Sequence, residues 1–258
     1  MKSFLLIPVF FLIASQPCFS AEKKSKQTTA PAGTNYEVRA DSRTNVEKLS
    51  DPDASVRTTS ARVLSRERDR KYLPDFIKLL NDKNPIARRI AVDALIEIST
   101  GPEMAAPVLA LLKTEEELNV KLSCINAVSR VKYEPALKYL VTMADDQNPV
   151  IRTYSLSALG EFNSPGTYSL IEGKIKDPAE GVKIEAVKAC VKLKIKTALP
   201  EIVELLKYPI APVRREAASA LGELGDKSVR KNLEKLLSDK DKSVAGAAKE
   251  ALDKIAKK

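Results

Sequence analysis

The helical pattern of this chain is clearest in the stretch Val213-Arg214-Arg215-Glu216-Ala217-Ala218-Ser219-Ala220-Leu221-Gly222-Glu223-Leu224-Gly225-Asp226. Counted from Val213, its apolar residues recur at offsets 0, 4, 7, 8 and 11, which is the spacing of one face of an α-helix. Gly225 stands where helices commonly end. The stretch therefore predicts a short amphipathic helix whose apolar face must be covered by another element.

The same pattern returns along the chain at intervals of 31 residues, with one interval of 33. Several units also contain a second apolar segment without strand alternation, such as 73–80 or 200–206. Since neither short helix can bury its apolar face alone, the units are expected to stack on one another. The sequence thus predicts an all-α fold, a right-handed superhelical α-solenoid of about seven two-helix repeats over residues 44–258. The anchor pair Val213-Arg214 has counterparts at Val56-Arg57, Ala87-Arg88, Val120-Lys121, Ile151-Arg152, Val182-Lys183 and Val244-Ala245.

Two stretches carry a resemblance to a known family. Asp177-Pro178 followed by Val182-Lys183, Ala186 and Ala189 matches the first half of a repeat pattern, and residues 213–226 match the second half. The chain resembles HEAT-like repeat proteins of the short kind found in phycobilisome bilin lyases. The resemblance covers about residues 44–258. It implies an α-solenoid that acts mostly as a binding scaffold, because only a minority of such arrays assist or perform chemistry.

The first 20 residues have the parts of a secretory signal peptide. Lys2 supplies a positive charge, residues 4–14 form an apolar core too short for a stable membrane span, and small residues precede Ala21. We interpret residues 1–20 as a signal peptide and expect an exported protein, periplasmic or secreted, with no transmembrane segment in the mature chain. A buried or membrane helix is the alternative.

Residues 21–43 are rich in Lys, Thr, Ala, Pro and Gly and contain few large apolar side chains, so they are predicted to form a flexible linker.

Cys18 leaves open a lipid anchor, although Gln16 and Pro17 stand where bacterial lipoproteins carry small residues. Cleavage after residue 20 removes Lys2 alone among the charged residues and lowers the net charge from +9 to +8. This charge leaves open weak contact with an anionic envelope surface.

The composition excludes several kinds of chemistry. The chain has no His, which excludes Ser-His-Asp and Cys-His catalysis and His-ligated zinc. Its three Cys are too few for a Cys₄ metal site, and the offsets of Cys124 and Cys190 predict two buried thiols too far apart to pair. The sequence therefore predicts no catalytic residues, no metal and no cofactor.

A basic column and an acidic column accompany the anchors. The basic residues stand in the first turn of each anchored helix, where a cation faces the positive end of the helix dipole and needs a partner. The acidic residues stand five positions before each anchor, where they are expected to cap the same helices and to pair with the basic residues one unit away. This ladder is expected to lapse at Tyr208 and Ala245. Its predicted members are Arg57, Arg88, Lys121, Arg152, Lys183 and Arg214 with Asp51, Asp82, Asp146 and Asp177.

A third column, ten positions after each anchor, alternates in sign at every step. Neighbouring members can neutralise one another, and a nucleic acid following this column would be repelled at every second unit. The sequence therefore predicts no nucleic-acid partner. The column consists of Arg66, Glu97, Arg130, Glu161, Lys192, Glu223 and Lys254.

The positions two, three and six residues after each anchor are expected to face the inside of the curve. Mixed charge with an isolated aromatic residue suits a protein partner better than a small-molecule pocket. We therefore interpret this concave face as the binding surface for a protein of unknown identity, with a merely solvated face as the alternative. The candidate binding residues are Arg89, Asp93, Tyr154, Lys188 and Arg215.

The sequence is compatible with three functions. The first is a non-catalytic protein-binding scaffold outside the cytoplasm. The second, which the resemblance implies, is a bilin-lyase-like enzyme or enzyme-assisting subunit. The third is binding to an anionic envelope polymer through the net positive charge.

Overall fold

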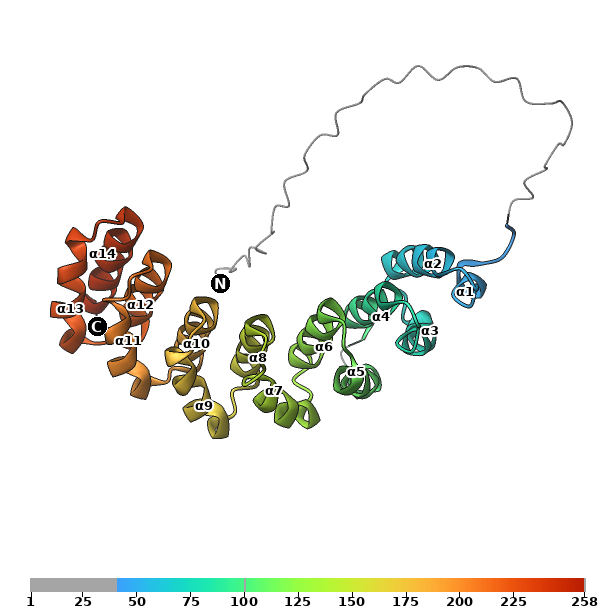
Figure 1. The fold of residues 1–258 in the computed structure, drawn as a ribbon, viewed down its shortest axis with the longest axis horizontal. Coiled ribbons are helices and arrows are strands. Elements are labelled where there is room, and N and C mark those ends of the chain that lie inside the picture. The colour runs from blue at the N-terminus through green and yellow to red at the C-terminus, as the bar shows by residue number, and fades with distance from the viewer. Residues whose placement is uncertain (1–40, 100, 258) are drawn as a thin grey trace, which may run out of the picture. The chain divides into compact units, whose positions relative to one another are not determined.

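The computed structural model describes residues 41–99 and 101–257, and this part of the chain contains α-helices and short 3₁₀ turns without any strand. Residues 42–258 form one compact unit, in which helix pairs follow one another in a curved row (Figure 1). The predicted all-α solenoid of two-helix repeats is confirmed. The predicted signal peptide, nearly all of the predicted linker, and Cys18 lie outside the described residues.

One helix of each pair lies along the inside of the curve and the other along the outside (Figure 1). The inner helices are α2 (Ala54–Glu67), α4 (Pro85–Ile98), α6 (Leu118–Arg130), α8 (Pro149–Phe162), α10 (Glu180–Leu193), α12 (Ala211–Leu224) and α14 (Lys242–Ala256). The outer helices are α1 (Asn45–Lys48), α3 (Leu73–Leu79), α5 (Pro102–Thr114), α7 (Leu137–Met143), α9 (Tyr168–Gly173), α11 (Leu199–Leu205) and α13 (Arg230–Glu234).

Short 3₁₀ turns lead into or extend most outer helices, so that the chain reverses direction within a few residues. They are η1 (Arg70–Tyr72), η2 (Glu134–Ala136), η3 (Pro165–Thr167), η4 (Lys174–Lys176), η5 (Lys196–Ala198), η6 (Lys227–Val229) and η7 (Lys235–Ser238).

The core is one continuous layer between the inner and outer helices. Each inner helix packs against the next inner helix and against the outer helix of its own pair. Large side chains such as Phe76, Leu95 and Leu159 are fully buried there. The small column seven positions after each anchor is buried from Ala94 onward, which lets neighbouring inner helices approach closely. Each repeat therefore depends on its neighbours for burial of its apolar stripe.

The inner helices α12 and α14 approach each other closely at Gly222. A Cβ atom added to Gly222 would lie 2.7 Å from the Cα of Ala251, whereas one added to the equivalent Gly160 on α8 would lie 3.6 Å from its nearest neighbour, Ala189. The absence of a side chain at Gly222 therefore sets the spacing of the last two inner helices.

The helices are capped two residues later than the sequence pattern suggested. Asp53, Asn84, Asn148 and Asp241 are the N-caps of four inner helices, and each accepts the backbone N–H two positions further on. The N-cap residues of α6, α10 and α12 make no such side-chain hydrogen bond. The acidic column instead accepts the N–H of the cap residue, as Asp82 does from Asn84 at 2.8 Å. The expectation that this column caps the helices was wrong, because its carboxylates are turned toward the preceding repeat.

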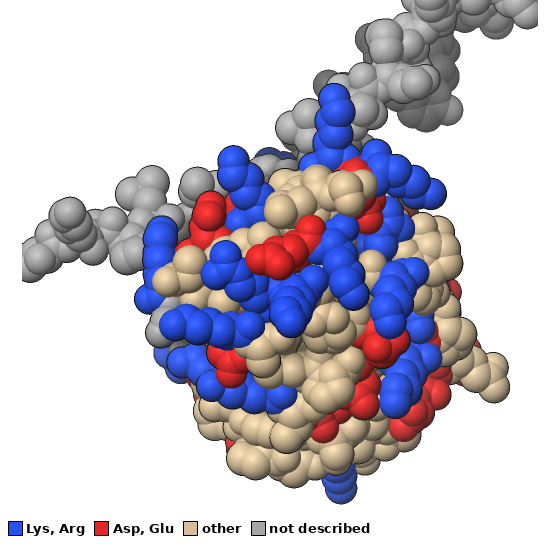
Figure 2. Space-filling view, turned by 90° about the vertical axis from the view of Figure 1, so that its left-hand side faces the viewer, with Lys and Arg blue, Asp and Glu red and all other residues tan. Residues whose placement is uncertain are grey.

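The end of the row formed by α13 and α14 is strongly charged. Figure 2 shows Lys and Arg side chains interspersed with Asp and Glu on this face. On α14, Val244, Ala248 and Ile255 are buried toward α12 and α13, while Lys249 and Asp253 are exposed. Water therefore solvates the outward side of this helix.

Candidate binding face and ion-pair ladder

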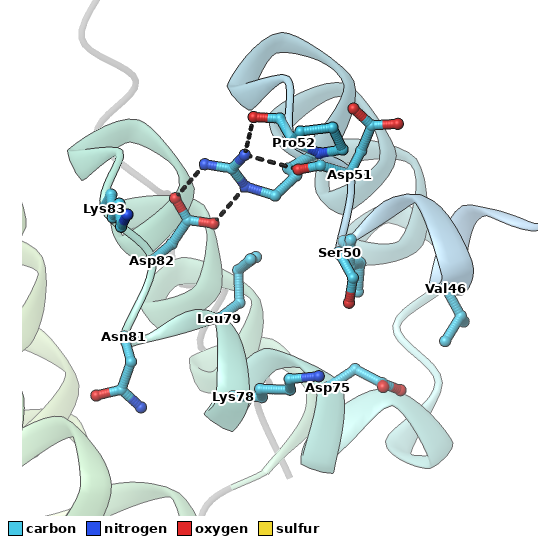
Figure 3. Close-up of a pocket in the computed structure, with 12 residues that line it drawn as sticks. Val46, Ser50, Asp51, Pro52, Asp75, Lys78, Leu79, Asn81, Asp82 and Lys83 are labelled. Carbon is cyan, nitrogen blue, oxygen red and sulfur yellow. Dashed lines mark hydrogen bonds and ion pairs between the residues drawn. The ribbon is translucent and has the colours of Figure 1, made fainter.

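An arginine at the start of each of four inner helices is fixed by four hydrogen bonds. Arg57 donates from Nε and one terminal nitrogen to the two carboxylate oxygens of Asp82, at 2.6 and 2.7 Å. Its other terminal nitrogen donates to the carbonyls of Asp51 and Pro52, at 2.8 and 3.0 Å (Figure 3). One guanidinium thus joins the loop of its own repeat to the loop of the next, in the bidentate geometry that favours Arg over Lys.

The same set of four hydrogen bonds, which we call a rung of the ladder, recurs along the row of repeats. Arg88 bonds both oxygens of Glu115, Arg152 those of Asp177, and Arg214 those of Asp239, with distances between 2.7 and 2.9 Å. Each of these arginines also donates to two carbonyls of its own repeat. Before the first rung, Arg43 contacts Asp51 at 2.6 Å. The basic and acidic columns therefore form ion pairs between successive repeats at every position where the basic column has arginine.

The two lysines of the basic column do not form rungs. Among the described residues, no ion pair within 4.0 Å joins Lys121 to Asp146. Lys183 lies instead with its Nζ 5.2 Å from the ring centroid of Tyr208. The expectation that lysine would substitute for arginine in the ladder was wrong at Lys121, whereas at Lys183 the lapse expected at Tyr208 is confirmed. A single ammonium cannot hold two carbonyls and two carboxylate oxygens at once, as the guanidinium fork does.

The rungs shift the pKa values of their carboxyls. Burial alone would raise the pKa of Asp82, but hydrogen bonds from Arg57 and from the Asn84 N–H outweigh it and hold the pKa below its usual range. The pKa values of Glu115 and Asp177 are lowered by the same balance, and that of Asp239 is lowered first by its hydrogen bond from Arg214. The carboxylates are therefore held in the charged form.

The alternating column pairs its members two by two. Glu97 contacts Arg130 at 3.4 Å, Glu223 contacts Lys254 at 2.8 Å, and Glu161 contacts Lys192. These side chains are roughly half exposed, so each pair contributes little to stability. The local charge is cancelled along this edge, which agrees with the sequence argument against a nucleic-acid groove.

The concave face, defined here as the exposed side of the inner helices, has an uncharged centre. Tyr154 on α8 is 44% exposed there. On the N-terminal side, Arg89 and Asp93 on α4 are exposed. The protein atoms around the Asp93 carboxyl desolvate it and raise its pKa, although Ser123 and Arg89 act in the opposite direction. The positions of α6 and α8 that were predicted to face inward carry no charge: Leu122, Ser123, Asn126, Thr153, Tyr154 and Ser157.

On the C-terminal side of this centre the charges return. Lys188 on α10 and Arg215 on α12 are exposed, and Lys188 lies 3.9 Å from Glu185. Desolvation and the charge of Glu185 raise the pKa of the half-buried Glu216, against the opposing effect of Lys188 and Arg215. Tyr154 thus lies between two charged groups that belong to different repeats.

The described residues include two cysteines and no candidate metal cluster. No group of three or more Cys, Asp or Glu side chains within them could hold a metal ion. Cys124 and Cys190 are buried and unpaired as predicted, and burial raises the pKa of both thiols, that of Cys190 to about 12. None of the helices in residues 41–99 and 101–257 combines the length and apolar character needed to cross a membrane.

A single curved row of helix pairs, tied together between repeats, defines the chain as an α-solenoid. The family of HEAT repeats matches residues 43–129 and 168–253, more than half of the chain, and the chain belongs to this family.

The "Uncharacterized phycocyanin operon protein Z" of Pseudanabaena tenuis is 26% identical over 148 residues, which cover 54% of this chain and 72% of the relative. The structure of YibA of Escherichia coli is similar with a TM-score of 0.55 and 21% identity, over 83% of this chain and 92% of that chain. A chain from the complex of CpcE and CpcF of phycocyanin lyase from Nostoc sp. PCC7120 has a TM-score of 0.52 and 17% identity, over 87% of this chain and 100% of that chain. Both structural similarities concern the fold.

Proposed function

We propose that this protein is a non-catalytic scaffold that binds a protein partner along its concave face, outside the cytoplasm. The observation that carries the proposal is Tyr154, exposed at the uncharged centre of this face, with Arg89 and Asp93 to one side and Lys188 and Arg215 to the other. Protein interfaces favour this arrangement, an aromatic anchor at the centre and charged residues at the rim. HEAT-repeat family membership supports a binding role, and the pattern of residues 1–20 supports export.

The test is capture of partners from an extracytoplasmic fraction of the source cells. The full chain is expected to retain a specific protein, and Tyr154→Ala is expected to weaken its binding by ten-fold or more, because central aromatic residues dominate interfaces. Ser157→Ala, a change on the same exposed face, is the matched control and should retain the partner. Capture of no specific protein, or equal retention by Tyr154→Ala, would contradict the proposal.

Export is tested separately. Fractionation of cells that express the full chain is expected to place a product shortened at its N-terminus by 20 residues in the periplasm or medium. An acylated product would instead support the lipid anchor at Cys18. A full-length product in the cytoplasm would contradict export and leave the binding proposal to be judged on the capture experiment.

A second candidate is a bilin-lyase-like enzyme or enzyme-assisting subunit. It is favoured by the relative that is a phycocyanin operon protein and by the structural similarity to a chain of phycocyanin lyase. Incubation with a bilin and an acceptor protein separates the two candidates. A stable visible adduct on the acceptor that forms only with this chain would replace the scaffold proposal.

The net charge of +8 that remains after cleavage behind residue 20 supports a third candidate, an electrostatic binder of an anionic envelope polymer. In that case retention on a polyanion column would survive deletion of residues 21–43 and decrease steeply with salt. Retention that is lost with residues 21–43 would assign the interaction to that segment.

A further inference from the structure

The ladder has one place where a buried cation lacks a carboxylate. Lys183 is 8% exposed, and within the described part of the chain its ammonium has neither an ion-pair partner nor a hydrogen-bond acceptor. Its neighbour is the ring of Tyr208, which stands where the other rungs have an acid. A cation–π contact satisfies the charge in part, but it supplies no acceptor for the three N–H donors of the ammonium.

A cavity opens at the same place. It has a volume of about 380 Å³, within the range of small-molecule sites, and lies between η4 and α11. Buried Ile175 and Leu205 and the exposed Pro200 give it an apolar wall, and Lys183 lines it as well. We call this cavity the fifth groove, because it lies at the fifth position of the basic column.

The other three charged side chains of the fifth groove each have an ion-pair partner, and one of these partners, Lys207, lies outside the lining. Lys176 contacts Glu201 at 3.6 Å, and Glu204 contacts Lys207 at 3.2 Å. Lys183 is therefore the one charge in the described lining of the groove without a counter-ion. A ligand that enters with a single negative charge would complete the rung that Tyr208 leaves open, and its carbon chain would cover Ile175 and Leu205.

We propose that the fifth groove binds a carboxylate carried on a short apolar stem, with Lys183 as the partner of the carboxylate. A carboxylate on an apolar stem has two sources, a free small acid or a glutamate side chain within an apolar peptide segment. This site lies away from the concave face and does not depend on the function proposed above.

The test is titration of the full chain, with its lysine side chains labelled for NMR, using hexanoate as the probe. Hexanoate is expected to shift the Lys183 ε-methylene signal in a saturable manner, while 1-hexanol and hexylamine, which have the same stem, leave it unchanged. A short apolar peptide with one central Glu, compared with its Gln counterpart, forms the second arm. Tighter binding of the Glu peptide than of hexanoate assigns the site to a protein side chain, and the reverse assigns it to a free acid.

Three variants make the outcome decisive. Lys183→Met, of similar length without charge, is expected to weaken hexanoate binding at least ten-fold, as judged by the amide signals of Ile175 and Leu205. The double variant Lys183→Arg with Tyr208→Asp restores a regular rung and is expected to abolish binding in a folded chain. Lys249→Met, at an exposed lysine of α14, is the matched control and should bind normally. Equal binding by wild type and Lys183→Met, or equal shifts with 1-hexanol, would overturn the proposal.

Discussion

Two equivalent grooves of the solenoid differ in how their central cation is held. The first groove, of about 660 Å³ between α1 and α3, contains Arg57 with both oxygens of Asp82 as partners (Figure 3). The fifth groove contains Lys183 at the equivalent position, and Tyr208 in place of the acid. Because the helices around them are alike, the comparison isolates what one ion-pair rung contributes. The cation of the first groove is bonded to the next repeat, whereas the cation of the fifth groove remains available to an external partner.

The largest effect is expected when the rung of the first groove is broken. Asp82→Ala leaves the guanidinium of Arg57, 13% exposed, without its carboxylate and removes the acceptor of the Asn84 N–H. Because an uncompensated, mostly buried charge is costly, the free energy of unfolding should fall by about 2–4 kcal/mol. Urea denaturation followed by circular dichroism measures it.

Two comparisons accompany this experiment. Tyr208→Leu in the fifth groove removes only a cation–π contact and should cost about 0.5–1 kcal/mol. Lys78→Met, on the exposed wall of the first groove, should change stability by less than about 0.5 kcal/mol. If Asp82→Ala costs no more than Tyr208→Leu, the rung does not hold the first groove together.

The pattern of residues was sufficient to predict the repeat and its partners at the arginine positions. Small or apolar residues recur in each unit at the positions of Val213, Ala217 and Leu221 because burial against the next helix requires them, so the helical period appears directly in the sequence. The offset between Arg57 and Asp82 follows from the same repeat length. Features that depend only on stacking could therefore be predicted from spacing.

The behaviour of the lysines could not be predicted in the same way. Arg57 also bonds the carbonyls of Asp51 and Pro52, and a backbone carbonyl leaves no trace in the residue pattern. Without those two bonds, Arg and Lys look equivalent in an alternating charge pattern. The fifth groove was missed for this reason, although the exchange of an acid for Tyr208 marked the place.

Acidic pH should weaken the Arg57–Asp82 ion pair of the first groove and leave the contacts of Lys183 in the fifth groove almost unchanged. The pKa of Asp82 is lowered in the folded state, so its contribution is present above the pKa of about 3.9 of an unfolded Asp and is lost as the pH falls through the folded value. Wild type should lose stability as the pH decreases below about 4, and Asp82→Asn should lose about 1–2 kcal/mol less over the same interval.

Amide hydrogen exchange at successive pH values measures this locally. Protection near Asn84 is expected to decrease with acid, while protection near Lys183 changes little, since Lys183 has no carboxylate partner within the described residues. Equal losses at both grooves would indicate a global effect of charge rather than titration of the rung.

Converting the fifth groove into a copy of the first should stabilise the chain. Lys183→Arg together with Tyr208→Asp supplies both members of a rung, and the free energy of unfolding is expected to rise by about 1–2 kcal/mol. Each single variant should give less than the pair, because Lys183→Arg alone gains no carboxylate, and the carboxylate of Tyr208→Asp alone meets an ammonium that cannot make the bidentate contact. A double-mutant cycle in urea measures the coupling, and additive single effects would show that the new pair does not interact.

The smallest effect is expected for an ion pair outside the grooves. Glu161 and Lys192 join neighbouring inner helices as a rung does, but their side chains are 46% and 47% exposed. Water and salt screen such a pair, so Glu161→Gln should cost about 0.5 kcal/mol or less, and the cost should disappear in 1 M salt. The cost of Asp82→Ala should persist in the same salt, since its rung is largely shielded from ions. If the stability cost of Asp82→Ala also disappeared in 1 M salt, the first groove would differ from the fifth only by having two opposite charges close together. Burial and complete hydrogen bonding of the ion pair would then not be the difference.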